Sequence, residues 1–500
     1  MTEEDEEGES RREPAVKDEE ADFRQLQRRT PVQRSVLVVA LLASCVSQIV
    51  VSFLIPFFPT VAMKTYGASE MDLGIILASL PFACVVSGPF VPAVIAHLGR
   101  ELTLVVGLAL MVGATFIFGF GASFTHFVVA RTGQGLASSL ISVASTALLM
   151  THSPDLGADL GMIEAFNGVV YTVGPVVGGV LFTYLGFLAT FASLSVLILL
   201  VMLCMPVLLR PLRRLKERRL LVSTSDDDDA TSKDWQTCEA SSAVGQVGQV
   251  GAVGPDDAEE GGAGGQVKNS ECCGPGTEKG SGEQQRQLWR LIPTCWLVWL
   301  GITVNIVSFG SYGFYDSFVA PQLNVALSLE AMGAALYYIV PASTYGVCCL
   351  LFGSQLGKRG CRPLLTAGLF VWGLSYIFFG PPPFLPVGSL SLRAGRVITW
   401  TCLAVSSLLY GPGCALAVLP VVPLMKAGVE EALRRLQSDR PYKPVGAVGS
   451  SVGEQDDALA ETVDDIVAAL GSTTMSLGEA LGPMKSCLTR RPPFLREGRR

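Results

Sequence analysis

The sequence is poor in charge and in histidine for a chain of 500 residues. Only 16% of its residues are charged, 49% are hydrophobic, and three are histidines. A soluble chain of this length with so few charges would not stay in solution, so the lipid bilayer is the expected solvent. His97, His126 and His152 lie at the edges of apolar runs, and we interpret them as solvated groups rather than catalytic bases.

Patterns typical of metal sites and disulfide frameworks are also missing. The 13 cysteines form no CxxC pair and show no metal-ligand spacing, and most of them fall inside apolar runs, where cysteine packs as a small hydrophobic residue. The sequence offers no cluster of His, Asp or Cys at the edge of the apolar runs that would suit an enzyme. We therefore expect no metal, no cofactor, no enzymatic activity and no nucleic acid partner.

The sequence is rich instead in apolar runs of roughly 20 residues, long enough for a helix to cross about 30 Å of hydrocarbon. Gly and Pro occur within them, as is tolerated in membrane helices. We predict membrane-spanning helices at residues 35–59, 73–98, 102–122, 124–150, 160–184, 187–209, 291–315, 331–356, 364–385 and 397–424.

The polar segments divide these helices into two groups. Basic residues precede the first run and follow the sixth, which places the N-terminus in the cytoplasm by the positive-inside bias. The predicted organisation is a disordered cytoplasmic tail (1–34), an N-terminal six-helix bundle (35–209), a disordered Gly-, Ser- and acid-rich cytoplasmic linker (210–287), a C-terminal helical bundle (288–485) and a basic tail (486–500).

The second bundle is expected to be incomplete. Residues 476–483 have the character of the middle of an eleventh helix, but from about Lys485 a basic tail replaces further apolar residues, and no twelfth helix follows. About ten full helices and part of an eleventh are therefore predicted. Gly99 with Gly107 in the first half matches Gly360 with Gly368 in the second, which indicates a duplication.

Three polar residues inside or beside the apolar runs of the first half are candidates for function. A guanidinium in an apolar helix is costly, so Arg131 must face a partner or a water-filled cavity unless it extends to the membrane interface. Gln134 lies near it on the same helix face. Glu164 can carry a proton if it is desolvated, or it can be interfacial.

Further polar candidates are expected to bind substrate or neighbouring helices. Asn167, one turn after Glu164, can hydrogen-bond a substrate or another helix. Asn305 has apolar neighbours and is a candidate for lining a cavity, whereas Asp316 sits where the seventh run ends and could be a solvated carboxylate. Small residues at Gly174, Gly178 and Gly179 would let helices approach closely, and Pro175 permits a bend.

Several of these segments resemble motifs of major facilitator transporters. Arg131-Thr132-Gly133-Gln134-Gly135 resembles the RxxQG motif of the fourth helix, whose Arg is associated with proton movement. The stretch from Gly174-Pro175 to Gly178-Gly179 is similar to the GxxxGPxxGG motif of the fifth helix, which marks the antiporters. Gly99-Arg100 fits the end of the cytoplasmic gating signature, although the Asp of that signature falls at Ala96.

The finer resemblance is to the vesicular amine and polyamine transporters of solute carrier family 18. It rests on Pro56-Phe57-Phe58-Pro59, on residues 164–182, and on Gly313-Phe314-Tyr315-Asp316, and it implies a cation-attracting or proton-coupling role for Asp316. The monoamine carriers have an Asp in the first helix where this chain has Ser47 beside Gln48, so a polyamine or another organic cation stays open.

The resemblance implies an all-α membrane protein with the major facilitator fold of two pseudo-symmetric six-helix bundles. Such a protein would be a secondary transporter that exchanges a small organic cation, an amine or polyamine, for protons by alternating access. We expect a monomeric, multi-pass protein of the vesicular, endomembrane or plasma membrane. The alternative is a receptor or scaffold derived from a transporter and unable to transport.

Overall fold

The fold was analysed in a computed structural model that describes residues 29–54, 57–218, 288–327, 331–379, 392–438 and 451–489. The chain divides into two compact units, residues 1–209 together with 282–500, and residues 210–281. Of the second unit, the structure describes residues 210–218, which are helical. The first unit contains all the elements discussed below.

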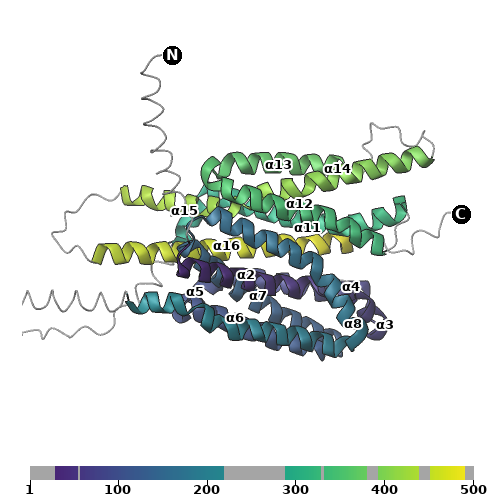
Figure 1. The fold of residues 1–500 in the computed structure, drawn as a ribbon, viewed down its shortest axis with the longest axis horizontal. Helices are drawn as coiled ribbons and strands as arrows, with labels where there is room; N and C mark the ends of the chain where they lie inside the picture. Colours follow the sequence, from purple (N-terminus) through teal and green to yellow (C-terminus); the bar gives the residue numbers. More distant parts are fainter. Residues whose placement is uncertain are drawn as a thin grey trace, which may run out of the picture. The chain divides into compact units, whose positions relative to one another are not determined.

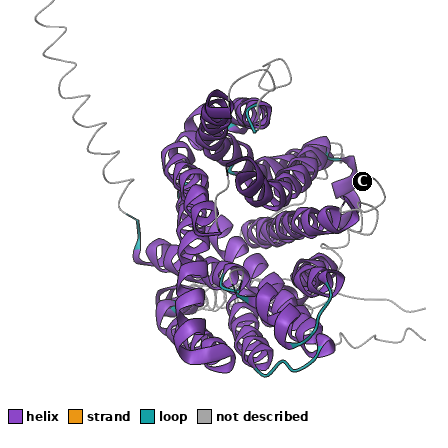
Figure 2. Ribbon diagram, turned by 90° about the vertical axis from the view of Figure 1, so that its right-hand side faces the viewer, coloured by secondary structure: helices purple, strands orange, loops and turns teal. Residues whose placement is uncertain are grey.

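Within the described ranges the first unit consists of helices joined by turns and short loops, and contains no strand (Figures 1 and 2). The N-terminal half comprises α2 (Pro31–Ser52), α3 (Phe58–Thr65), α4 (Glu70–Ser87), η1 (Gly88–Phe90), α5 (Val91–Leu98), α6 (Arg100–Gly119), α7 (Phe124–His152) and α8 (Leu156–Leu208). The C-terminal half comprises η2 (Ile292–Thr294), α11 (Trp296–Leu327), α12 (Ala331–Arg359), α13 (Cys361–Ile377), α14 (Leu392–Val418), α15 (Val421–Ser438) and α16 (Ser451–Thr489).

Many of these helices are suited to a bilayer. Seven helices of the described residues are long and apolar enough to cross a membrane, and an eighth joins them if the bent pair Leu288–Thr294 and Trp296–Ser311 is one span. Their outward faces carry large apolar side chains such as Phe82, Leu351 and Val397, which are 63%, 58% and 64% exposed. Side chains of this kind are stable on such faces in contact with lipid.

Glycines with positive φ separate several helices at the expected places. Gly99 precedes α6 with φ +78° and ψ 158°, and Gly360 precedes α13 with φ +81° and ψ 158°. Both positions have a positive φ, which glycine adopts readily because it has no Cβ and which other residues rarely adopt. Gly186, with φ +76°, breaks α8 into the fifth and sixth predicted helices.

Several predicted helix boundaries were wrong. The run predicted over 364–385 ends as α13 at Ile377. The first helix ends at Ser52 and not at residue 59, since a proline at position 56 has no N–H to donate to the carbonyl of Ser52. The run predicted to end at residue 315 continues as α11 to Leu327. The run 397–424 is interrupted by a turn at residues 419–420, between α14 and α15.

The predicted small residues of α8 lie against the end of α2. A Cβ on Gly174 would lie 2.3 Å from Oγ of Ser52, and a Cβ on Gly178 would lie 2.1 Å from the carbonyl oxygen of Phe53. Pro175 lies inside the helix, and Gly179 is half-buried. Close approach of α2 and α8 therefore requires glycine at positions 174 and 178.

The two halves meet along a seam of small residues between α8 and α12. A Cβ on Gly157 would lie 2.6 Å from the carbonyl oxygen of Gly353, and a Cβ on Gly161 would lie 2.4 Å from that of Cys349. Backbone therefore contacts backbone across this glycine seam. On another side of the unit, α16 packs against α11 of its own half and against α4 and α7 of the other half.

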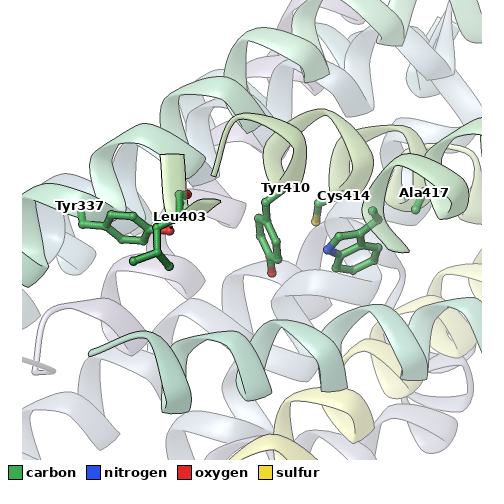
Figure 3. Packing of buried hydrophobic residues seen from close by; sticks show 6 residues of the cluster. Tyr337, Leu403, Tyr410, Cys414 and Ala417 are labelled. Atoms are coloured by element: carbon green, nitrogen blue, oxygen red, sulfur yellow. Dashed lines mark hydrogen bonds between the residues drawn. The ribbon is translucent and has the colours of Figure 1, made fainter. Parts of the chain in front are cut away.

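A cluster of buried aromatic and apolar side chains joins three helices of the C-terminal half (Figure 3). Tyr337, Leu403, Tyr410, Cys414 and Ala417 are buried together with Trp372, whose ring meets that of Tyr410 edge to face at 5.8 Å. The hydroxyl of Tyr337 donates to the carbonyl of Leu403 at 3.2 Å. This packing fixes α12, α13 and α14 relative to one another, and α14 carries the cavity residue Val418.

Candidate functional site

A cavity of about 160 Å³, lined by both apolar and polar side chains, lies between the two halves. Its lining comes from α2, α4, α7 and α8 of the first half, and from α11, α14, α15 and α16 of the second, together with the turn after α14. A cavity between helices of facing halves is where transporters of repeated architecture bind their substrates.

Helical periodicity explains which side chains reach the cavity. On α2 the lining residues Ala40, Ser44, Ser47, Gln48 and Val51 recur every three or four positions, so they share one face of the helix. The lining residues of α16 follow the same spacing, at positions 468, 471, 472, 475, 476 and 479. Each helix thus presents one stripe of small and polar side chains to the cavity.

Glu164 is one of the cavity residues, as its sequence context indicated. The hydroxyl of Tyr345, on α12, donates a hydrogen bond to its Oε2 at 2.9 Å. Asn167, one turn along α8, also lines the cavity, and its Oδ1 accepts a hydrogen bond from Ser44 Oγ at 2.9 Å. The structure therefore brings these two predicted residues together, with one partner in each half.

Asn305 lines the opposite side of the cavity. It is 4% exposed, and its Nδ2 donates to the carbonyl of Gly471 at 3.2 Å and to Thr474 Oγ1 at 3.0 Å. These bonds join α11 to α16. On the other wall, the buried Oγ of Ser47 has no hydrogen-bond partner among the described residues, so a ligand would satisfy it.

The charge of the cavity lining is one-sided. Glu164 and Glu479 are both among its residues, and none of the described residues that line it is Lys, Arg or His. Carboxylates enclosed without a basic partner attract cations or protons, because an isolated charge is costly in a desolvated site. The lining therefore suits a positively charged ligand.

Glu479 falls within residues 476–483, the part of an eleventh helix predicted from the sequence, which gave it no functional role. The criterion applied to Arg131, an ionisable group within an apolar helical stretch, would also have identified Glu479 as a candidate. Its position beside Glu164 could not be read from the sequence, because α8 and α16 are about 300 residues apart along the chain.

Arg131 and Gln134 do not line the cavity. Arg131 is 2% exposed, and its Nη1 donates to Gln134 Oε1 at 3.0 Å and to the carbonyl of Val50 at 3.5 Å. Gln134 in turn donates to Thr115 Oγ1 at 3.2 Å. These bonds join α2, α6 and α7 inside the first half, so the side chain of Arg131 does not extend to the helix end.

Arg100 lies in a second polar cluster, at the start of α6. Its Nε pairs with Asp465 Oδ1 at 2.7 Å, its Nη1 donates to Thr151 Oγ1 at 2.7 Å, and its Nη2 donates to the carbonyl of Glu461 at 2.6 Å. Thr151 donates to Asp464 at 2.9 Å, and Lys426 pairs with Asp464 at 2.7 Å. We call Arg100, Thr151, Lys426, Asp464 and Asp465 the α16 latch.

In the α16 latch, Arg100 pairs with a carboxylate of α16, since the Asp of the gating signature is absent from its own loop. Ala96 stands where the gating signature has its Asp, yet Arg100 is buried against carboxylates. These come from α16, in the other half, so the two halves are joined at this end by charge-assisted hydrogen bonds. A signature confined to one loop could not reveal partners 365 residues away.

Asp316 remains a prediction as a site residue. It falls inside α11 and not at a helix end, since that helix runs from Trp296 to Leu327. Its side chain lies outside the described residues. Nothing in the cavity geometry therefore tests its proposed role.

Apolar helices that can span a bilayer, arranged as two halves around a cavity, define a multi-pass membrane protein. The chain belongs to the Major Facilitator Superfamily, whose sequence profile matches residues 40–428. The fold is also similar to that of the proton:xylose symporter XylE, with a TM-score of 0.54 and 14% sequence identity. The match covers 93% of this chain and 90% of XylE. The expected fold class is confirmed.

Shorter matches relate the chain to vesicular carriers. It is 31% identical to the vesicular acetylcholine transporter of Torpedo marmorata over 134 residues. These residues make up 26% of this chain and 26% of that protein. It is 28% identical over 134 residues to the synaptic vesicular amine transporter of Homo sapiens, with the same shares covered. The chain thus spans about a quarter of the length of these curated relatives.

Proposed function

We propose that this protein exchanges a small organic cation for protons across a vesicular, endomembrane or plasma membrane, with its N-terminus in the cytoplasm. The observation that carries the proposal is Glu164, a carboxylate in a cavity shared by both halves and free of described basic residues. The partial likeness to transporters of acetylcholine and amines supports a cationic substrate.

In the proposed cycle, proton and cation compete for the same carboxylate. On the proton-rich side Glu164 takes up a proton, becomes neutral and releases the cation. On the other side it loses the proton and binds a new cation. The halves rock about the cavity between these steps, so the pH gradient drives transport. Asp316 is retained as a second proposed proton-coupling group.

The surrounding polar residues have supporting parts in this cycle. Asn167 and the free hydroxyl of Ser47 would offer hydrogen bonds to an ammonium group or to water around it. Arg131 and Gln134 would act indirectly, by holding α2, α6 and α7 together. The α16 latch would close the cavity at the cytoplasmic end while it is intact.

The proposal is tested by uptake of labelled amines into vesicles containing the protein, with and without an acidic interior. Gradient-dependent uptake that an uncoupler abolishes is the expected result, and E164Q should reduce it at least tenfold. A matched control is E430Q, a change to a more exposed acid on α15. Absence of amine flux with the unaltered protein would contradict the proposed amine transport and favour a receptor or scaffold.

A further inference from the structure

The C-terminal half begins with a sharp bend. The short helical segment Leu288–Thr294 makes an angle of 81° with the helix Trp296–Ser311 that follows it. The long helix is suited to cross the bilayer, so the short segment lies near the plane of the membrane, at the level of the lipid headgroups. Leu288 and Ile292 are buried on one side of this segment, whereas Arg290 is exposed. The bend therefore presents a basic residue at the membrane surface.

Two exposed tryptophans stand in the first turn of the long helix, directly after the bend. Trp296 and Trp299 are 59% and 51% exposed, and the indole N–H of Trp299 donates to the carbonyl of Pro293 at 3.2 Å. Tryptophan gathers at the headgroup level of membranes, because its ring is apolar and its N–H is polar. The hydrogen bond of Trp299 holds the bend, and both rings are open to lipid.

An arginine from a different helix lies over one of these rings. The guanidinium carbon of Arg362, in the first turn of α13, is 5.5 Å from the centroid of the Trp296 ring. A guanidinium that stacks on a ring by its face keeps the N–H groups at its edge available, and these suit the oxygens of a phosphate. Arg362 is exposed, and no acid among the described residues pairs with it or with Arg290.

The acids that α15 brings towards this bend have partners of their own. A Cβ on Gly428 would lie 2.8 Å from Cβ of Leu297, so α15 packs against the start of α11. The next two acids on α15 pair with arginines one turn further on, Glu430 with Arg434 and Glu431 with Arg435. The positive charge of Arg362 is therefore left for a group outside the protein.

We propose that Trp296, Trp299 and Arg362 form a binding site for one anionic phospholipid, which we call the α11 lipid site. The guanidinium of Arg362 binds the phosphate, and the two indole rings contact the glycerol and the upper part of the acyl chains. In the proposed orientation this end of the chain faces the cytoplasm, whose leaflet carries the anionic lipids. None of the three residues lines the cavity, so the ligand of this site is distinct from the cargo.

The test measures lipid binding to the purified full-length protein in detergent by native mass spectrometry. Phosphatidylserine and phosphatidylcholine with identical acyl chains serve as probes, since their headgroups differ in net charge. A basic residue near an anionic headgroup contributes about fivefold in affinity, so phosphatidylserine should bind more tightly by this factor. R362A should remove most of this preference and leave the binding of phosphatidylcholine unchanged.

The control is R434A, which removes an exposed arginine of α15 that already pairs with Glu430. This variant should keep the preference for phosphatidylserine. A further variant, W296L, keeps the test decisive where R362A does not fold. It retains an apolar side chain but removes the aromatic face under Arg362, so the preference should fall severalfold.

Three results would overturn the α11 lipid site. The first is equal affinity of the unaltered protein for the two lipids. The second is an equal loss of preference in R362A and R434A, which would indicate a diffuse effect of surface charge. The third is displacement of bound phosphatidylserine by inorganic phosphate, because the site would then recognise the free anion and not the lipid.

Discussion

The hydroxyl of Tyr345 donates a hydrogen bond to the carboxylate of Glu164 at 2.9 Å, from α12 of one half to α8 of the other. The proposed cation-binding group is therefore positioned by the half to which it does not belong. A change in the angle between α8 and α12 would lengthen or break this bond. The environment of the Glu164 carboxylate therefore depends on how the two halves are arranged.

The Tyr345–Glu164 bond predicts a defined effect of Y345F. A hydrogen bond to a charged group contributes about 1.5–3 kcal/mol, so its loss should make the carboxylate a poorer competitor for the cation. We expect the apparent KM for amine uptake to rise about tenfold or more. Y376F is the matched control, because its hydroxyl donates instead to the carbonyl of Ser311. Equal kinetics in the two variants would contradict this role of Tyr345.

We predict that breaking the α16 latch exposes the cavity to solvent. Cys84 lines the cavity on α4, and its accessibility to a charged thiol reagent reports opening. In a variant that retains Cys84 as its single cysteine, R100A should increase the labelling rate from the side of the membrane at which the latch lies severalfold, because one member of a buried pair is removed.

The control for the latch is R434A, which removes an exposed i,i+4 pair with Glu430 on α15. Pairs of this kind contribute only about 0.3–0.5 kcal/mol, so the labelling rate should not change. If R100A and R434A label at the same rate, the latch does not close the cavity.

The contact of α2 with α8 predicts a stability difference between two glycine substitutions. G178A places a Cβ 2.1 Å from the carbonyl oxygen of Phe53, whereas G113A on α6 places a Cβ with nothing within 4 Å. Overpacking of this kind costs about 1–3 kcal/mol. The melting temperature in detergent should therefore fall for G178A and stay level or rise for G113A. A similar melting temperature for both would show that α2 and α8 do not pack this closely.

The glycine seam predicts that a bulky side chain at its centre impairs transport. G161L would force α8 away from the carbonyl of Cys349, where even a Cβ would lie at 2.4 Å. Initial uptake rates should fall more than fivefold, compared with G373L, a change on α13 where a Cβ meets nothing within 4 Å. Uptake by G161L equal to that by G373L would argue against close approach of the halves in the transport cycle.

Local features of the sequence predicted most of the helices. The apolar runs gave their number in the first half, and the positive φ of Gly99 and Gly186 agrees with the predicted breaks. The boundaries at residues 315 and 424 were wrong because hydrophobicity alone does not mark the end of a helix. α11 continues through Asp316, and α15 continues past Lys426 into a charged segment.

The site was predictable only in part, for a physical reason. Glu164, Asn167 and Asn305 are polar residues in apolar runs, and each has a place in the cavity. The pairing of Arg100 with Asp465 depends on packing between distant helices, so a local motif cannot indicate it. Arg131 satisfies the expectation of a buried partner, but that partner is the adjacent Gln134 and a backbone carbonyl, not a cavity group.

The continuity of α16 has a mechanical consequence. The latch acids Asp464 and Asp465 and the cavity acid Glu479 stand on one uninterrupted helix, from Ser451 to Thr489. At 1.5 Å per residue, roughly 22 Å separates the latch from Glu479, so a rigid-body tilt of α16 with Arg100 as its pivot would be magnified at Glu479. A tilt of about 5° about that pivot displaces Glu479 by roughly 2 Å, close to the difference between a formed and a broken hydrogen bond.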